Sequence, residues 1–372
     1  MTAPLDDPAA MPDRRRVLRL MASLPLLRGP GNAMAGGARV HLVPLTAPVI
    51  PAAPFRDGAR VLMAGPAQGP LSPWGRRLAA ALPVGLPPGS RVALTPMGGG
   101  DGVTAANQFG ARTGDGHILL LTPGATVLAW LVGEGRVKFD VGGWVPVCAA
   151  ASPALLMGRF EPLALRAGQV LRLAVDRLPG PELAGLLALA LLGARPRPVP
   201  GLDRAAAEAA LLRGALDAVL LTGDRVVARA ARLRARGMRP IASFGAFGPD
   251  GRLRRDPDFP TVPEVAELAA ALHGGPADPP LMRAWRATAA AAQLRFGLDL
   301  PALTPAGMVA LWRRAGAAAM GAPAVAGPLT SNGWRSLTGS AALANARALA
   351  ADTPALLALR HWLSSRRTWR VG

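Results

Sequence analysis

From residue 58 onward, short apolar runs alternate with longer segments of helical periodicity. Such runs predict buried strands, and the segments between them predict helices that start at serine or proline and stop at glycine. Ser72 is expected to cap one helix, with Pro73 at its first position. The first part of the pattern predicts strands at 60–64, 91–95 and 118–121 and helices at 72–82 and 103–112.

The same alternation returns further along the chain. Asp203 and Asp224 each stand where a helix should begin, so both are expected to be N-caps. The second part predicts strands at 170–175, 217–221 and 240–243 and helices at 181–192, 203–214, 224–237, 304–314, 340–351 and 353–364. Alternating strands and helices imply an α/β fold, with open parallel-type sheets covered by helices on both faces.

Composition limits the size and the partners of this fold. The 372 residues are 51% hydrophobic, enough for two ordinary domains or one large domain with a sizeable core. The formal net charge of +19 raises the question of nucleic-acid binding. The basic residues are almost all dispersed arginines and accompany no nucleic-acid-binding motif, so no nucleic-acid partner is expected. A basic protein still favours anionic solutes through its field.

The N-terminus has the order of an export signal. Arginines at 14–16 precede an apolar stretch at 20–27, and a small-x-small pattern follows at 33–35. This order predicts a secretory signal at 1–35, of the twin-arginine or the general type, and a periplasmic protein. A basic leader without an export role is the alternative. Residues 36–57 are rich in proline and alanine and are interpreted as a linker.

The residue types that carry enzyme chemistry are sparse. None of the four histidines has a partner at metal-ligand spacing, and neither a nucleophile elbow nor a P-loop lysine occurs. Cys148 is the single cysteine and is expected to be a buried small side chain. His117 is expected to be structural. The sequence therefore predicts a protein that is not an enzyme, with no catalytic residue, no metal and no cofactor.

Two loops that join a strand to a helix are the informative features. Residues 98–102 are glycine-rich and indicate a sharp connection rather than a phosphate loop, because no lysine follows. Residues 68–73 end a strand and open a helix, which leaves N–H groups that suit a carboxylate. The alternative for residues 68–73 is a plain helix cap.

An ordered set of short motifs resembles one family of proteins, the tripartite tricarboxylate transporter receptors, which are Bug-type (TctC) periplasmic solute-binding proteins. Residues 99–106 and 115–120 are similar to the family pattern PGAGGNIGA…PDGYTLL. Further similarities, in the family's order, lie at 199–200, 213–217, 236–242, 257–264 and 303–307.

The resemblance implies a two-lobed periplasmic-binding-protein fold of the Venus flytrap type, with two doubly wound sheets joined by crossing strands. Lobe 1 would comprise 58–156 plus 292–372, and lobe 2 would comprise 157–291. It also implies a small organic anion, such as a carboxylate, held between the lobes. The partners would be the permease subunits of a tripartite transporter in the membrane, and the receptor itself is expected to be a monomer.

The residues at the family's ligand loops are the candidate contacts. They are Gln68, Gly69, Ser72, Thr122, Gly124, Ala125, Thr126, Asp176, Arg177 and Thr222. Several depart from the family pattern: Gln68 replaces a glycine, Pro123 lacks an N–H, and Asp176 would repel a carboxylate unless it binds an amine. A diverged member that no longer binds a carboxylate, and serves as a sensing or protein-interaction module, is therefore the alternative.

Overall fold

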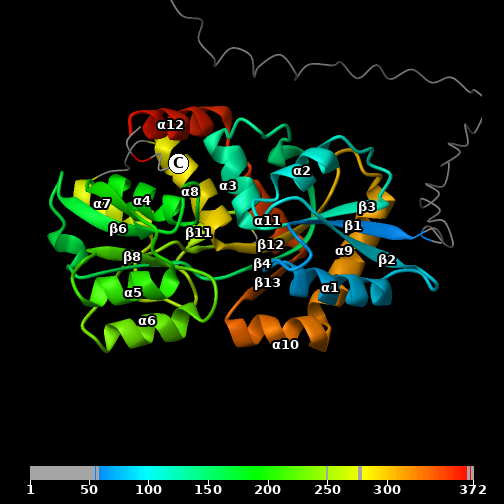
Figure 1. The fold of residues 1–372 in the computed structure, drawn as a ribbon, viewed down its shortest axis with the longest axis horizontal. Helices are drawn as coiled ribbons and strands as arrows, with labels where there is room; N and C mark the ends of the chain where they lie inside the picture. Colours follow the sequence, from blue (N-terminus) through cyan, green and yellow to red (C-terminus); the bar gives the residue numbers. More distant parts are fainter. Residues whose placement is uncertain (1–54, 56–57, 249, 275–278, 367–368, 370–372) are drawn as a thin grey trace, which may run out of the picture. The chain divides into compact units, whose positions relative to one another are not determined.

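The computed structural model describes Phe55 and residues 58–248, 250–274, 279–366 and 369, all within the unit that spans Pro48–Gly372. The predicted signal (1–35) lies outside the described residues, and so does the predicted linker (36–57) apart from Phe55. The described chain forms two main sheets with helices packed on them (Figure 1). The predicted α/β class is therefore confirmed.

Six strands form the first sheet, called sheet A, in the order β13-β4-β12-β3-β1-β2. Strand β1 pairs in parallel with β2 and β3, whereas β12 and β13 run antiparallel to their neighbours. The strands are β1 (Ala59–Ala64), β2 (Val92–Met97), β3 (Ile118–Thr122), β4 (Val145–Ala151), β12 (Leu294–Leu300) and β13 (Arg335–Thr338).

Five strands form the second sheet, called sheet B, in the order β7-β6-β8-β5-β9. Here β6 is parallel to β7 and β8, and β5 is antiparallel to β8 and β9. The strands are β5 (Leu155–Gly158), β6 (Val170–Val175), β7 (Arg195–Pro200), β8 (Ala218–Leu221) and β9 (Arg239–Ser243). A separate hairpin pairs β10 (Ala246–Phe247) with β11 (Leu253–Arg254).

Helices cover both sheets (Figure 1). Those that pack on sheet A are α1 (Ser72–Ala81), α2 (Val103–Gly110), α3 (Gly124–Val132), α9 (Ala306–Gly321), α10 (Pro323–Asn332) and α11 (Gly339–Leu349). Those that pack on sheet B are α4 (Glu182–Leu191), α5 (Arg204–Leu212), α6 (Val226–Arg234) and α7 (Val265–His273). Two more, α8 (Pro279–Gln293) and α12 (Thr353–Ser364), pack on each other, and both also contact α3. Short 3-10 turns occupy Leu82–Gly85, Val141–Gly143 and Pro162–Ala164.

Strand β3 shows why the central strands are so apolar. Leu120 belongs to the core on one face of sheet A, and Leu119 and Leu121 belong to the core on the other face. All three are fully buried. A strand covered by helices on both faces needs apolar residues at every position rather than at alternate ones, which is why this run of leucines predicts a buried strand.

The chain passes from sheet A to sheet B at residues 152–154, between β4 and β5, and returns where α8 leads into β12. Hydrogen bonds join these passages. The Ser152 N–H donates to the Gln293 carbonyl at 2.9 Å, and the Gly223 N–H donates to Ser152 Oγ at 3.0 Å. The predicted lobe boundaries stay predictions; the first two residues of β5 in sheet B, Leu155 and Leu156, fall within the predicted first segment of lobe 1 (58–156).

Two predicted helix starts are wrong. Ser72 is the first helical residue of α1 rather than its N-cap, which is Leu71, and no side chain caps this helix. Arg225, with a left-handed φ of 51°, is the N-cap of α6 in place of Asp224. Asp203 is confirmed as the N-cap of α5, because its carboxylate accepts from the Ala206 N–H at 2.8 Å.

Candidate functional site

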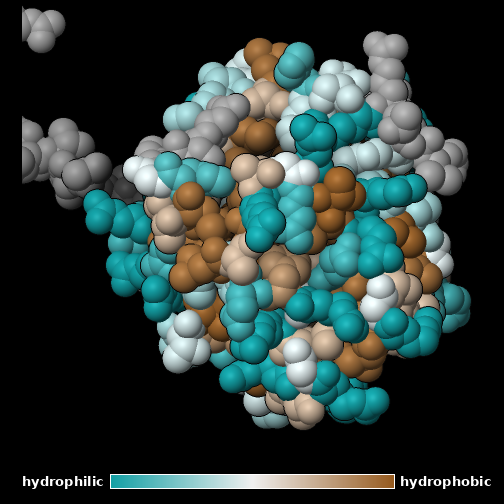
Figure 2. Space-filling model, turned by 90° about the vertical axis from the view of Figure 1, so that its left-hand side faces the viewer, coloured by the Kyte–Doolittle hydropathy of each residue, from teal (hydrophilic) through white to brown (hydrophobic). Residues whose placement is uncertain are grey.

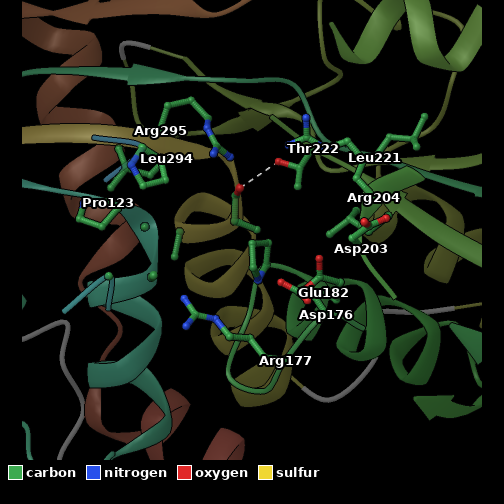
Figure 3. A pocket seen from close by; sticks show the side chains of 18 of the residues that line it. Pro123, Asp176, Arg177, Glu182, Asp203, Arg204, Leu221, Thr222, Leu294 and Arg295 are labelled. Atoms are coloured by element: carbon green, nitrogen blue, oxygen red, sulfur yellow. Dashed lines mark hydrogen bonds between the residues drawn. The ribbon is translucent and has the colours of Figure 1, made fainter. Parts of the chain in front are cut away.

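A pocket of about 450 Å³ lies between sheet A and sheet B (Figure 3). Segments that follow β1, β3, β6, β7 and β8 line it, so it faces the carboxyl ends of parallel strands in both sheets. Ligands of open α/β sheets bind at this edge, because the strand-to-helix loops leave a crevice there. The turn from α8 into β12 closes one side of the pocket.

The structure brings six of the ten predicted contacts to this pocket and leaves four outside its lining. Those that line it are Gly69, Gly124, Ala125, Asp176, Arg177 and Thr222. Those that do not are Gln68, Ser72, Thr122 and Thr126. Each of the two candidate ligand loops of sheet A places some of its residues at the pocket, but the loops differ in how their N–H groups are used.

The loop before α1 has already used its donors. The Gly69 N–H donates to the Pro66 carbonyl at 2.9 Å, and the Ser72 N–H donates to the Gly69 carbonyl at 3.0 Å. The Ser72 hydroxyl is buried and accepts from Arg76 Nη1 at 2.6 Å. Pro73 has no N–H. A carboxylate would therefore find few free donors at this helix end.

The loop before α3 keeps its donors. Gly124 and Ala125 are the first two residues of α3, so their N–H groups have no partner inside the helix. Both residues line the pocket, at the positive end of the helix dipole. Thr126 supports this end from within, since its N–H donates to the Pro123 carbonyl at 3.1 Å and its hydroxyl to the Asp101 carbonyl at 2.8 Å.

Gly124 also permits a close approach that brings a further cation to the site. A Cβ at position 124 would lie 1.9 Å from the Ala291 carbonyl oxygen, so α3 begins directly against the end of α8. Strand β12 starts three residues after Ala291, and its second residue is Arg295. The start of α3 and Arg295 therefore border the same pocket (Figure 3).

Arg295 is the strongest candidate that the sequence did not reveal. Its side chain is only partly exposed, and its Nε is shielded from solvent and has no hydrogen-bond partner. Burial lowers the pKa of this guanidinium. Its Cζ lies 5.4 Å from the ring centroid of Trp334. A partly buried guanidinium without a full set of acceptors favours an anion beside it.

Arg204 lies near Arg295 at the same end of the pocket. A Cβ at Gly223 would be 2.7 Å from Arg204 Nη2 and 3.8 Å from Arg295 Nη1. Two guanidinium groups thus flank the Gly223 backbone. Arg204 has a carboxylate partner, Asp224, at 3.5 Å on the surface. Two like charges in proximity repel each other, so an anion bound at this end would be stabilised by both guanidinium groups.

Thr222 and Arg229 line the pocket but are satisfied by the protein. The Thr222 hydroxyl donates to the Ala292 carbonyl at 3.0 Å, which fastens sheet B to the end of α8 (Figure 3). Arg229 Nε donates to Glu208 Oε1 at 2.6 Å, and its Nη1 donates to the Thr222 carbonyl at 2.9 Å. The Thr222 side chain therefore stabilises the junction of the two sheets, and Arg229 joins α6 to α5 and to the loop after β8 on the sheet B side.

Acidic groups enter the pocket from the sheet B side. Glu182 is the first residue of α4, and its Oε2 is shielded from solvent without a hydrogen-bond partner. Burial raises the pKa of the Glu182 carboxyl to about 6; neighbouring Asp176 also raises it, and Arg177 and Arg204 lower it. Asp176 and Arg177 follow β6 directly. In Figure 3 these three side chains lie across the pocket from Arg295.

The described residues hold no group of three or more histidine, cysteine or acidic side chains placed to bind a metal ion. Cys148 is buried in β4, as predicted, and burial raises the pKa of its thiol to about 12. A thiol so hard to ionise is a poor nucleophile. Within the same part of the chain, no helix is long and apolar enough to cross a membrane.

Comparison with known proteins supports the fold. The chain matches no protein-family model and no curated protein. Among solved structures it resembles a TctC solute-binding protein from Polaromonas, with a TM-score of 0.59 and 16% identity, over 83% of this chain and 98% of that one. At this identity the likeness shows the fold, so the predicted two-lobed α/β fold of the periplasmic binding proteins is confirmed.

Two further structures resemble the chain more weakly. One is MatC from Rhodopseudomonas palustris with bound malate, with a TM-score of 0.43 and 20% identity over 78% of this chain and 96% of that one. The other is an R. palustris protein with adipate, with a TM-score of 0.45 and 18% identity over 84% and 97%.

Proposed function

We propose that this protein is a periplasmic receptor that captures a small organic anion, a carboxylate, in the pocket between its two sheets. It hands the anion to the permease subunits of a tripartite tricarboxylate-type transporter and performs no chemistry on it. One observation carries the proposal. The free N–H groups of Gly124 and Ala125 and the Arg295 guanidinium are all hydrogen-bond donors, and they border the same end of the pocket.

These donors fit a carboxylate in number and in kind. Two helix-terminal N–H groups can bind one oxygen, and a guanidinium can bind the other. Hydrogen bonds to charged groups contribute about 1.5–3 kcal/mol each. Three such contacts can support a dissociation constant near the micromolar range, which corresponds to about −8 kcal/mol.

The fold supports capture by closure. The passages at Ser152 and Gln293 join the sheets through short segments, and such segments serve as hinges in two-lobed binding proteins. Sheet A and sheet B would be the cores of lobes 1 and 2, and the receptor would act as a monomer. The predicted signal at 1–35 supports export, and the absence of a membrane-spanning helix among the described residues is consistent with release into the periplasm.

Thermal shift followed by calorimetry with a panel of mono-, di- and tricarboxylates tests the proposal. A ligand at a hundred times its dissociation constant should stabilise the protein by about 2.7 kcal/mol. Arg295→Met should weaken the binding of that ligand by roughly a hundredfold, because one buried charged contact disappears. The free variant should remain folded, since the substitution removes a guanidinium whose Nε has no hydrogen-bond partner and keeps most of the apolar stem.

Arg239→Met is the matched control, because Arg239 pairs with Glu161 on the surface and both side chains are exposed. It should bind the same ligand as tightly as the original chain. If no carboxylate stabilises the protein, or if Arg295→Met binds as well as the control, the carboxylate receptor is excluded and the sensing or interaction module takes its place.

The surface on the sheet B side bears on the interaction module. Figure 2 shows hydrophobic residues there in small groups among hydrophilic ones, not as the broad apolar surface typical of stable interfaces.

A further inference from the structure

The charges that line the pocket are balanced. An anion receptor would be expected to have an excess of cations around its ligand. Here four arginines and four carboxylates line one pocket, namely Arg177, Arg204, Arg229, Arg295, Asp176, Glu182, Asp203 and Glu208.

Half of these groups are already engaged within the protein. Arg229 is paired with Glu208, and Asp203 caps α5. Arg204 has Asp224 as a partner. These contacts hold the pocket in shape and leave little for a ligand.

The remaining groups are Arg295 on one side of the pocket and Asp176, Glu182 and Arg177 on the other, so the second side has two carboxylates against one arginine. Arg295 enters from β12 beside the start of α3, and Glu182 and Asp176 enter from the sheet B side (Figure 3). Each end includes a shielded atom without a partner, Nε of Arg295 and Oε2 of Glu182. Arg177 is within electrostatic range of both Glu182 and Asp101.

The acidic end disfavours a second carboxylate on the ligand. A dicarboxylate bound at Arg295 would direct its far carboxylate toward Glu182 and Asp176, and like charges in a pocket repel strongly. An ammonium group at the same place would pair with these side chains and would also satisfy Glu182 Oε2. Desolvated charges in a pocket need opposite charges beside them.

We infer that the ligand of this pocket is an amino carboxylate whose two charges stand at opposite ends of a short chain. Its carboxylate lies at Arg295 and the first N–H groups of α3, and its ammonium lies between Glu182 and Asp176. This inference rests on the receptor function proposed above and narrows its ligand from organic anions to zwitterions.

Three probes of equal chain length separate the possibilities: 4-aminobutanoate, glutarate and butanoate. Each has a carboxylate and three carbons beyond it; the third carbon carries an ammonium in 4-aminobutanoate, a second carboxylate in glutarate and only hydrogen in butanoate. Calorimetry on the full chain should give at least about a tenfold lower dissociation constant for 4-aminobutanoate than for the other two. Homologues with one or two more methylenes, 5-aminopentanoate and 6-aminohexanoate, set the distance between the two ends.

Glu182→Gln tests the acidic end. The variant should lose about tenfold in affinity for the amino carboxylate and keep the affinity for butanoate, because the amide has the same shape without the charge. Glu161→Gln is the control, since Glu161 is an exposed surface carboxylate paired with Arg239. The melting temperature of each free variant shows that it is folded.

The pH dependence gives a second readout. The Glu182 carboxyl has a pKa of about 6, raised by burial and by Asp176 and lowered by Arg177 and Arg204. Protonation removes the partner of the ligand's ammonium, so affinity for 4-aminobutanoate should fall as pH drops from 7 to 5. Affinity for butanoate should fall less over this range, and Glu182→Gln should remove the difference between the two probes.

The outcomes distinguish this inference from the receptor function. If glutarate or butanoate binds as tightly as any amino carboxylate, the zwitterion inference is overturned while the carboxylate receptor stands. The same holds if Glu182→Gln leaves 4-aminobutanoate binding unchanged. If none of the carboxylates binds, both proposals fall.

Discussion

Helices α1 and α3 make an instructive comparison, because each is the next helix after a parallel strand of sheet A and each was predicted to contact an anion. At α1 the N–H groups of Gly69 and Ser72 donate to carbonyls of the same loop. At α3 the N–H groups of Gly124 and Ala125 stay free and border the pocket. The position of a helix after a parallel strand is therefore not sufficient for an anion site. The N–H groups at its start must also be free of hydrogen bonds within their own loop.

The difference has a further cause in the neighbours of each helix. The start of α3 rests against the end of α8, which leads into β12 and Arg295. At α1, Arg76 belongs to the helix itself and donates to Ser72. A helix terminus thus becomes a stronger anion site when a second chain segment brings a cation to it.

The largest expected effect comes from replacing a glycine by alanine in each of the two loops and comparing the losses of stability. Gly124→Ala places a Cβ against the Ala291 carbonyl, so it should reduce the free energy of unfolding by about 3 kcal/mol and abolish ligand binding. Gly69→Ala meets Pro66 atoms at 3.1 Å, which small shifts can relieve, so it should lose less than about 1 kcal/mol. Urea unfolding of both variants measures this; equal losses would contradict the close approach at α3.

A smaller effect concerns the strand that brings Arg295 to α3. Burial raises the pKa of Asp299, also on β12, to about 7. The folded protein therefore binds a proton that the unfolded chain releases above about 4, so stability from this group is present at low pH and is lost as pH rises through 7. Asp299→Asn should raise the melting temperature at pH 8 and change it little at pH 4. A gain of equal size at both pH values would show that the carboxyl is not protonated in the fold.

The smallest expected effect comes from removing a backbone N–H at the second residue of α3 and adding one at the second residue of α1. Pro73 is the second residue of α1, and Ala125 is the second residue of α3. Ala125→Pro removes one N–H in the first turn, where proline is tolerated, and should weaken carboxylate binding about five- to tenfold. Pro73→Ala adds an N–H to α1 and should leave the affinity unchanged. A gain in affinity from Pro73→Ala would show that α1 also contacts the ligand.

Much of the scaffold could be predicted because its signals are local. The leucines of β3 and the glycine turn before α2 indicate a buried strand and a sharp connection within a few residues. Asp203 was recognised as a cap because its spacing to the helix is fixed. The prediction that Asp224 caps α6 is wrong, although it is also an aspartate, because the left-handed Arg225 is the N-cap of that helix.

The candidate site could be predicted only in part. Gly124, Ala125, Asp176 and Arg177 lie where a strand is followed by a helix, so their position at the pocket follows from the order of the elements. Arg295 gave no signal, because it is one arginine among many and lies more than 160 residues from α3 in the chain. Thr222 was predicted as a ligand contact and lines the pocket, but its hydroxyl donates to Ala292.

By itself, the sequence determined the alternation of strands and helices and the loops that could face a ligand, since these depend on periodicity and on turn residues; the two-lobed fold was implied by the family resemblance. The tertiary structure alone decided which loops keep free donors and which charges meet. The Arg295 guanidinium and the Glu182 carboxylate come from distant segments, and whether each finds a partner depends on packing between the two sheets. Oppositely charged side chains pair only when they lie within a few ångströms of each other in the folded protein, and their separation along the chain does not reveal that distance.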